Sequence, residues 1–260
     1  MEFRRSLLLN AVTLPAYWKE CRLARGKMTV SEEHLTYGKD RRQYAIVVRG
    51  AGCRPGRYAF YFHGGAWTFG RPEAFVPAAG PWLEQGYTVV LPSYRRPPVV
   101  GMHGIVADCR AAIAAVAGPE TTTHLHVGGI SAGAHLAALL ALRPTWWHAA
   151  GWAIAPQKAL LCAGPLVLAD LKPRAIFRPY AAYDPFGIPV GVAHRMQWQL
   201  LHGTDDALVS HEHSRKFYDK LTAAGQVANL MTLPGGTHLD SGRWMFGGVG
   251  EQRVKEFLGE

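Results

Sequence analysis

Cysteine is scarce in this sequence, and long apolar segments are missing. The four cysteines are too far apart for the C-x-x-C spacing of a metal or redox site: Cys21, Cys53, Cys109 and Cys162. No stretch reaches the roughly 18 apolar residues that a transmembrane helix needs. Arg4 and Arg5 precede a leucine run, but Asn10 breaks this run before it reaches the length of a signal peptide. We therefore expect a cytoplasmic protein with free thiols, no metal, no cofactor and no stable membrane insertion.

Acidic residues are also few, because 19 Asp and Glu face 28 Lys and Arg and leave a formal net charge of +9. A basic surface can attract nucleic acid or other anions. No aromatic-and-basic repeat and no zinc-finger spacing accompanies the charge here. We interpret the charge as a solvated basic surface and expect no nucleic-acid partner.

The chain is otherwise ordinary for a globular protein, with 48% hydrophobic and 18% charged residues. Its 260 residues are enough for one α/β domain spanning residues 1–260. Short apolar runs that are typical of strands alternate with helical patterns. These runs lie at 35–38, 43–48, 58–62, 87–92, 125–128, 158–162, 197–201 and 227–233. The alternation predicts a mostly parallel central sheet with helices on both faces.

Two segments could cover a functional site at the edge of such a sheet. Residues 1–30 are predicted to be helical, with one basic side. Residues 165–195 are irregular and proline-rich, and we expect a small cap or lid there. Four aromatic side chains of this second segment could either line a substrate pocket or pack in the core. They are Phe177, Tyr180, Tyr183 and Phe186.

The segment Gly129–Gly133 has the pattern G-x-S-x-G, between an apolar run and an alanine- and leucine-rich run. This order predicts a strand, a very tight turn and a helix. The turn forces Ser131 into a strained backbone conformation, and only small residues two before and two after it avoid a clash. Ser131 is therefore a candidate nucleophile. The alternative is a glycine-rich turn with a bystander serine.

A second glycine-rich stretch, His63-Gly64-Gly65-Ala66-Trp67, follows the predicted strand at 58–62. Its glycines allow the backbone to direct N–H groups toward a tetrahedral oxyanion, as acyl transfer requires. The N–H of Ala132, immediately after the serine, would complete this oxyanion hole. The alternative is a turn with a packed tryptophan.

Two further stretches also follow strands. The stretch His202–Asp206 ends in adjacent acidic residues, of which we favour Asp206 over Asp205 as the acid. The alternative is a pair that forms a turn and caps a helix. His238 follows the last strand and can serve as a general base. The chain order Ser131, Asp206, His238 is the order expected of this architecture.

With these motifs the chain resembles the α/β-hydrolase superfamily, in particular the hormone-sensitive-lipase-like carboxylesterases and the kynurenine formamidases. The resemblance covers roughly residues 35–258. It implies that Asp206, the fifth position of H-G-x-x-D, is the catalytic acid. It also implies an oxyanion hole made by the N–H groups of Gly64, Gly65 and Ala66 together with that of Ala132. His63 is then expected to brace the loop rather than to react.

The chain departs from these families at two places. Lipase-like members usually have a third glycine where this chain has Ala66, and Trp67, the predicted substrate contact, is closer to the formamidase-type motif. Many relatives read D-Y-x-L-x-P after the next strand, whereas this chain reads Ser93-Tyr94-Arg95-Arg96-Pro97. The substrate-side loop is therefore expected to differ from that of the formamidases.

The predicted function is hydrolysis of small to medium carboxylic esters by a Ser131–His238–Asp206 triad, through an acyl-enzyme. The partner is a small-molecule ester or amide, and a homodimer is one assembly that the sequence allows. One alternative is an arylformamidase that cleaves an amide such as N-formylkynurenine. Another is a non-catalytic ligand-binding protein on a hydrolase fold.

Overall fold

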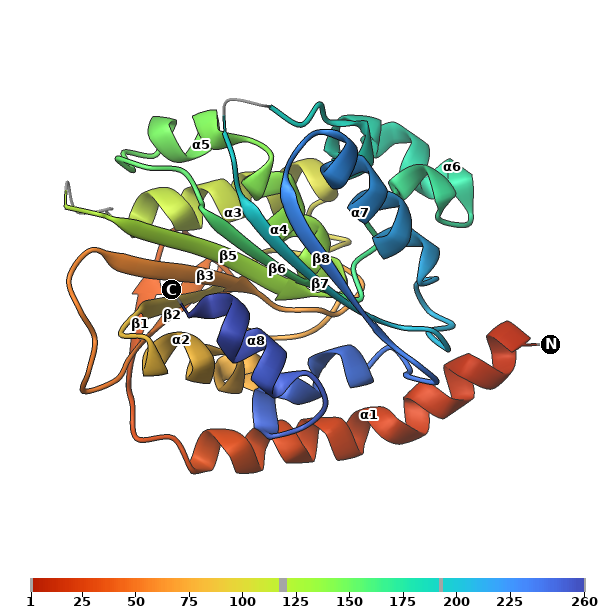
Figure 1. Ribbon diagram of the computed structural model, residues 1–260, viewed down its shortest axis with the longest axis horizontal. Coiled ribbons are helices and arrows are strands. Elements are labelled where there is room, and N and C mark those ends of the chain that lie inside the picture. The colour runs from red at the N-terminus through yellow and green to blue at the C-terminus, as the bar shows by residue number, and fades with distance from the viewer. Residues whose placement is uncertain (1, 117–120, 192–193, 260) are drawn as a thin grey trace.

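The computed structural model describes residues 2–116, 121–191 and 194–259. Within these residues, eight strands form one sheet in the order β1-β2-β4-β3-β5-β6-β7-β8 (Figure 1). The strands are β1 (Ser31–Thr36), β2 (Tyr44–Arg49), β3 (Arg57–Phe62), β4 (Thr88–Pro92), β5 (His124–Ile130), β6 (Lys158–Cys162), β7 (Gln197–Gly203) and β8 (Val227–Leu233).

The sheet is parallel from β4 through β8, and only β2 pairs with its two neighbours in the antiparallel sense. The prediction of a mostly parallel sheet is therefore confirmed. The first strand begins earlier than expected, at Ser31 rather than Leu35. Its residues are largely exposed, so it carries no apolar run that could mark it in the sequence.

Helices cover both faces of the sheet (Figure 1). The helices α1, α2 and α8 lie on one face, and α3, α4, α5 and α7 lie on the other. Their bounds are α1 (Glu2–Gly26), α2 (Gly80–Glu84), α3 (Met102–Ala115), α4 (Ala132–Ala141), α5 (Pro144–Ala149), α6 (Arg174–Phe177), α7 (Glu212–Ala223) and α8 (Glu251–Leu258). The 3₁₀ segments are η1 (Pro72–Ala79), η2 (Leu168–Asp170), η3 (Arg178–Tyr183), η4 (Pro185–Gly187) and η5 (Asp240–Phe246).

The core is divided by the sheet into two layers. Alternate residues of β3 point to opposite faces, so Phe60 and Phe62 pack with α3 and α4 while Tyr61 packs with the α1 side. Continuous apolar strands such as this one are the expected result when both faces are covered. The apolar runs of the sequence thus predict the buried strands correctly.

The N-terminal segment is helical, as the sequence predicts, and α1 buries Tyr17 and Cys21 against the body of the protein. It packs on η1 and η5. All four cysteines are free thiols. No helix among the described residues is both long enough and apolar enough to cross a membrane.

Candidate active site

Ser131 lies in the tight turn between β5 and α4, with a φ of 55° and a ψ of −124°. A residue other than glycine rarely adopts a positive φ, and this strained conformation persists only where the surrounding structure enforces it. Gly129 and Gly133 do so here. A Cβ on Gly129 would lie 2.4 Å from the carbonyl of Gly133, and a Cβ on Gly133 would lie 1.9 Å from the Phe62 oxygen. These clashes explain why both positions of the motif are occupied by glycine.

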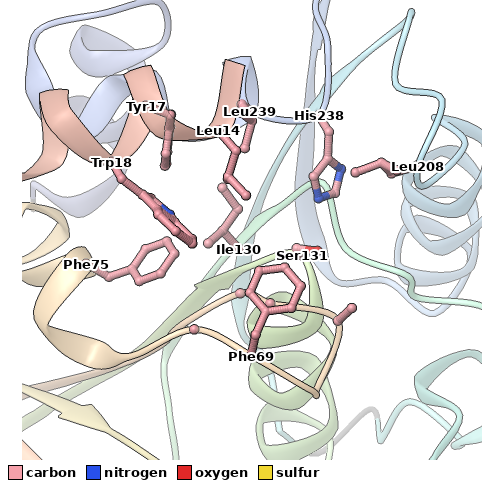
Figure 2. A pocket seen from close by; sticks show the side chains of 14 residues that line it. Leu14, Tyr17, Trp18, Phe69, Phe75, Ile130, Ser131, Leu208, His238 and Leu239 are labelled. Carbon is pink, nitrogen blue, oxygen red and sulfur yellow. The ribbon is translucent and has the colours of Figure 1, made fainter. Parts of the chain in front are cut away.

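His238 and Asp206 meet at the same edge of the sheet. Asp206 follows β7 and His238 follows β8, and both side chains are buried. The Nδ1 of His238 lies 2.6 Å from Oδ2 of Asp206. Because the carboxylate can only accept, Nδ1 carries the proton and Nε2 is left as the acceptor. Figure 2 shows the imidazole directed toward Ser131 across a common cavity.

Asp206 is held as a carboxylate by several donors. The backbone N–H groups of Leu208 and Val209 each donate to its Oδ1 at 2.9 Å. Burial by itself raises the pKa of Asp206, but the attraction of His238 and the hydrogen bonds from His202 and His238 outweigh it and hold the pKa well below its usual value. The neighbouring Asp205 is exposed instead, and accepts from the Thr204 hydroxyl.

His202 is a site neighbour that the sequence reasoning missed. It is fully buried, and its Nε2 faces two acceptors: Asp206 Oδ2 at 3.0 Å and the Val209 carbonyl at 2.9 Å. Nε2 must therefore carry the proton, while Nδ1 accepts from the Ser214 hydroxyl at 2.7 Å. The only feature of the sequence that could have indicated this role of His202 is its position as the first residue of the H-G-x-x-D stretch.

The loop of residues 63–70 passes close to Ser131. A Cβ on Gly64 would lie 3.1 Å from the Ile130 oxygen and 3.3 Å from the Cβ of Ser131, so the backbone of Gly64 packs tightly against the serine turn. Gly65, Ala66 and Trp67 all have positive φ values, of 125°, 47° and 60°. In the part of the chain that the structure describes, the N–H groups of the four residues predicted to form the oxyanion hole donate to no protein acceptor. These are Gly64, Gly65, Ala66 and Ala132.

His63, at the start of this loop, is held in place by Tyr94. Its ring is fully buried and stacks on Tyr94, with centroids 4.4 Å apart and planes 6° apart. The Tyr94 hydroxyl donates to the His63 carbonyl at 3.1 Å. Burial lowers the pKa of His63 to about 4, so the ring is neutral at pH 7.

A cavity of about 350 Å³ opens at Ser131 (Figure 2). It is lined by the loop glycines, His238 and a set of mostly apolar side chains. That set is Leu14, Tyr17, Trp18, Phe69, Phe75, Ile130, Leu208 and Leu239. The first three come from α1, so the N-terminal helix forms one wall. Sequence reasoning assigned none of these eight to the pocket, because the wall depends on contacts between distant segments.

The structure places Trp67 outside this set. Its indole packs edge-on against His135, with centroids 5.2 Å apart, and contacts Phe177 at 6.0 Å. The other aromatic residues of the 165–195 segment also lie away from the cavity lining. Tyr180 and Tyr183 pack on the core that surrounds α3 and α4. In the described residues, the cover of the Ser131 cavity therefore comes from α1.

Part of the chain matches a known family model. Residues 53–146 match a family model described as BD-FAE, an α/β-hydrolase-like domain. This segment contains the loop at 63–70 and the serine turn. No curated protein matches the chain in sequence.

Solved structures extend the similarity to most of the chain. A truncated carbohydrate esterase from gut microbiota has a TM-score of 0.74 and 17% identity, covering 89% of this chain and 95% of that one. Esterase B from Lactobacillus rhamnosis has a TM-score of 0.71 and 16% identity, covering 98% and 93%. The esterase Est2 of Thermogutta terrifontis has a TM-score of 0.65 and 25% identity, covering 86% and 89%. With its eight-stranded, mostly parallel sheet and its serine turn, the chain thus has the α/β-hydrolase fold and is similar in structure to these esterases.

Proposed function

We propose that this protein is a carboxylic ester hydrolase in which Ser131 is the nucleophile, His238 the general base and Asp206 the acid. The observation that carries the proposal is the hydrogen bond of 2.6 Å between His238 and Asp206, beside a cavity that both His238 and Ser131 line. A serine hydroxyl is a weak nucleophile unless a base removes its proton. Figure 2 shows the His238 side chain directed toward Ser131, and its Nε2 is proposed to take that proton.

In the proposed reaction, the Ser131 oxygen bonds to the ester carbonyl carbon while His238 takes the serine proton. The resulting oxyanion accepts hydrogen bonds from the N–H of Ala132 and from those of the loop at Gly64–Ala66. His238 then protonates the departing alcohol, and the acyl group stays on Ser131. Water, deprotonated by His238, releases the carboxylic acid and restores the serine.

The substrate is proposed to be an ester with a small or medium apolar group. The cavity of about 350 Å³ is large enough for a short acyl chain, and its walls offer few polar partners. Among the similar proteins, Est2 is known with propionate bound, and Esterase B is known inhibited by a tributyrin phosphonate. Both are compounds of short acyl chains.

The test is turnover of p-nitrophenyl acetate and butyrate by the wild type and by Ser131→Ala. The substitution should abolish turnover and labelling by a fluorophosphonate probe, while the far-UV circular dichroism stays that of the wild type. Unchanged turnover in Ser131→Ala would remove Ser131 from the mechanism. A wild type without labelling or turnover would favour the ligand-binding alternative.

The arylformamidase hypothesis uses the same residues and is tested in the same assay. Cleavage of N-formylkynurenine with a higher kcat/KM than any short ester would replace the ester proposal. Turnover of the esters alone would support it.

A further inference from the structure

Arg96 carries a buried charge without an acidic partner. Only 8% of the residue is exposed. Its Nε donates to the Tyr94 carbonyl at 3.2 Å, and its Nη1 donates to the Gly70 carbonyl in a short hydrogen bond. In the described residues no carboxylate forms an ion pair with it, although the preceding Arg95 pairs with Asp108. A buried charge with carbonyl partners alone is costly, and a structural role in packing would be served by an apolar residue.

The acceptor of Arg96 connects it to the loop at Ser131. Gly70 closes this loop, with a φ of 92°, and a Cβ there would lie 2.3 Å from the Gly64 oxygen. The backbone of Gly70 is therefore packed directly on that of Gly64. Holding the Gly70 carbonyl fixes the position of Gly64, which in turn lies against Ser131.

The start of the loop is held by the same short segment. Tyr94 stacks on His63 and donates to its carbonyl, and the carbonyl of Tyr94 accepts from Arg96. Tyr94 thus holds the start of the loop at 63–70 through His63, and Arg96 holds its end through the Gly70 carbonyl.

We propose that Arg96 is a positioning residue of the oxyanion hole, which holds the loop at 63–70 so that its N–H groups face the developing oxyanion. The inference rests on the proposed ester hydrolysis. Arg96 acts through Gly70 and Gly64, and does not touch the substrate. Because the hole stabilises the transition state more than the bound ester, its misplacement lowers kcat rather than raising KM.

The experiment compares Arg96→Met and Arg96→Lys with the wild type on p-nitrophenyl butyrate. We expect kcat of Arg96→Met to fall on the order of 10- to 100-fold, with KM within about two-fold. The rate of fluorophosphonate labelling should fall by a similar factor, because that adduct also needs the hole. Arg96→Lys keeps a cationic donor but lacks the fork geometry, so its kcat should lie between the two.

Arg143→Met is the matched control. The guanidinium of Arg143 also donates to a backbone carbonyl, that of Ala182 at 2.9 Å, but in a part of the molecule that does not line the Ser131 cavity. Its kcat should equal that of the wild type. Circular dichroism and thermal unfolding establish that each variant is folded.

A kcat of Arg96→Met equal to that of the wild type would overturn the proposal, as would a loss of kcat that only follows a loss of folded protein. Should Arg96→Met fail to fold, Arg96→Lys decides: a lower kcat at unchanged KM supports the proposal, and a wild-type kcat contradicts it. A wild type with no turnover and no labelling would instead refute the proposed function, and is thereby distinguished from a failure of the role of Arg96.

Discussion

Two buried carboxylates of this protein differ in the kind of side chain that donates hydrogen bonds to them. Asp108 on α3 is 1% exposed and accepts from the Arg95 guanidinium at 2.7 Å and from Gln43 at 2.9 Å. Asp206 is 6% exposed and accepts from two imidazoles. Both have several donors, so both burials are compensated.

The difference lies in what the partner can do. A guanidinium keeps its proton at any pH that a protein experiences, so the Arg95–Asp108 pair can only hold structure. An imidazole gains and loses a proton near neutral pH, so a carboxylate beside it can stabilise the charged form during a reaction. We infer that Asp108 stabilises the loop after β4 and that Asp206 serves catalysis.

The strongest test of this comparison is Asp206→Asn. An amide in this place can donate as well as accept, so it no longer enforces the proton on Nδ1 of His238. In the serine-protease template the equivalent change costs on the order of 10⁴-fold in kcat, and we expect a similar loss here. Steady-state kinetics on p-nitrophenyl butyrate measures it. An activity within ten-fold of the wild type would show that Asp206 is not the acid.

The converse test is Asp108→Asn. It leaves the Arg95 guanidinium, whose side chain is 28% exposed, without its carboxylate. We expect the free energy of unfolding in urea to fall by about 1–3 kcal/mol, while kcat changes by less than about ten-fold. A loss of activity as large as that of Asp206→Asn, with stability intact, would break the distinction between the two carboxylates.

A smaller effect is expected from His202→Phe, which removes one of the donors to Asp206 and keeps a ring in the buried site. Asp206 would retain His238 and the two N–H groups of Leu208 and Val209. We expect kcat to fall about ten-fold, or about 1.4 kcal/mol. His202→Gln, which can still donate, should recover part of the loss. Equal activity in the wild type and both variants would limit His202 to packing.

The smallest effect is a pH dependence of stability. The pKa of Asp206 is lower in the folded protein than its ordinary value, so its carboxylate stabilises the fold above the unfolded pKa, about 3.9. This contribution is lost as the pH falls below that value. The difference in unfolding free energy between the wild type and Asp206→Asn should shrink by about 1 kcal/mol between pH 5 and pH 3. If this difference in unfolding free energy grew on acidification, the pKa of Asp206 would be raised by folding rather than lowered.

Local sequence was sufficient for the parts of the site that depend on backbone geometry. The Ser131 turn could be predicted because G-x-S-x-G is a short local pattern. Within it, a Cβ on Gly129 would lie 2.4 Å from the carbonyl of Gly133, whereas the 1.9 Å approach of Gly133 is to the Phe62 oxygen of β3, in a distant segment of the chain. The strands β3 to β7 could be predicted because their burial on both faces leaves short apolar runs. β1 has no such run, and its start was therefore misplaced.

The sequence could not identify the surroundings of the site to the same depth. The sequence favoured Asp206 over Asp205 only by its position in H-G-x-x-D, whereas the structure separates them by the burial of Asp206 and by its contact with His238. The same holds for His202, one histidine among 12 in the sequence, whose two ring nitrogens acquire defined roles only from Asp206, Val209 and Ser214.

By itself, then, the amino-acid sequence determined the buried strands, the strained serine turn and the order of the three candidate catalytic residues, since each can be recognised from a short pattern and its place along the chain. Only the tertiary structure decided which segment lines the cavity at Ser131. Leu14, Tyr17 and Trp18 of α1 do so, while the aromatic residues at 177–186 do not. The apolar character of a side chain predicts that it will be buried but does not identify the residues that it will pack against, because the hydrophobic effect is non-directional.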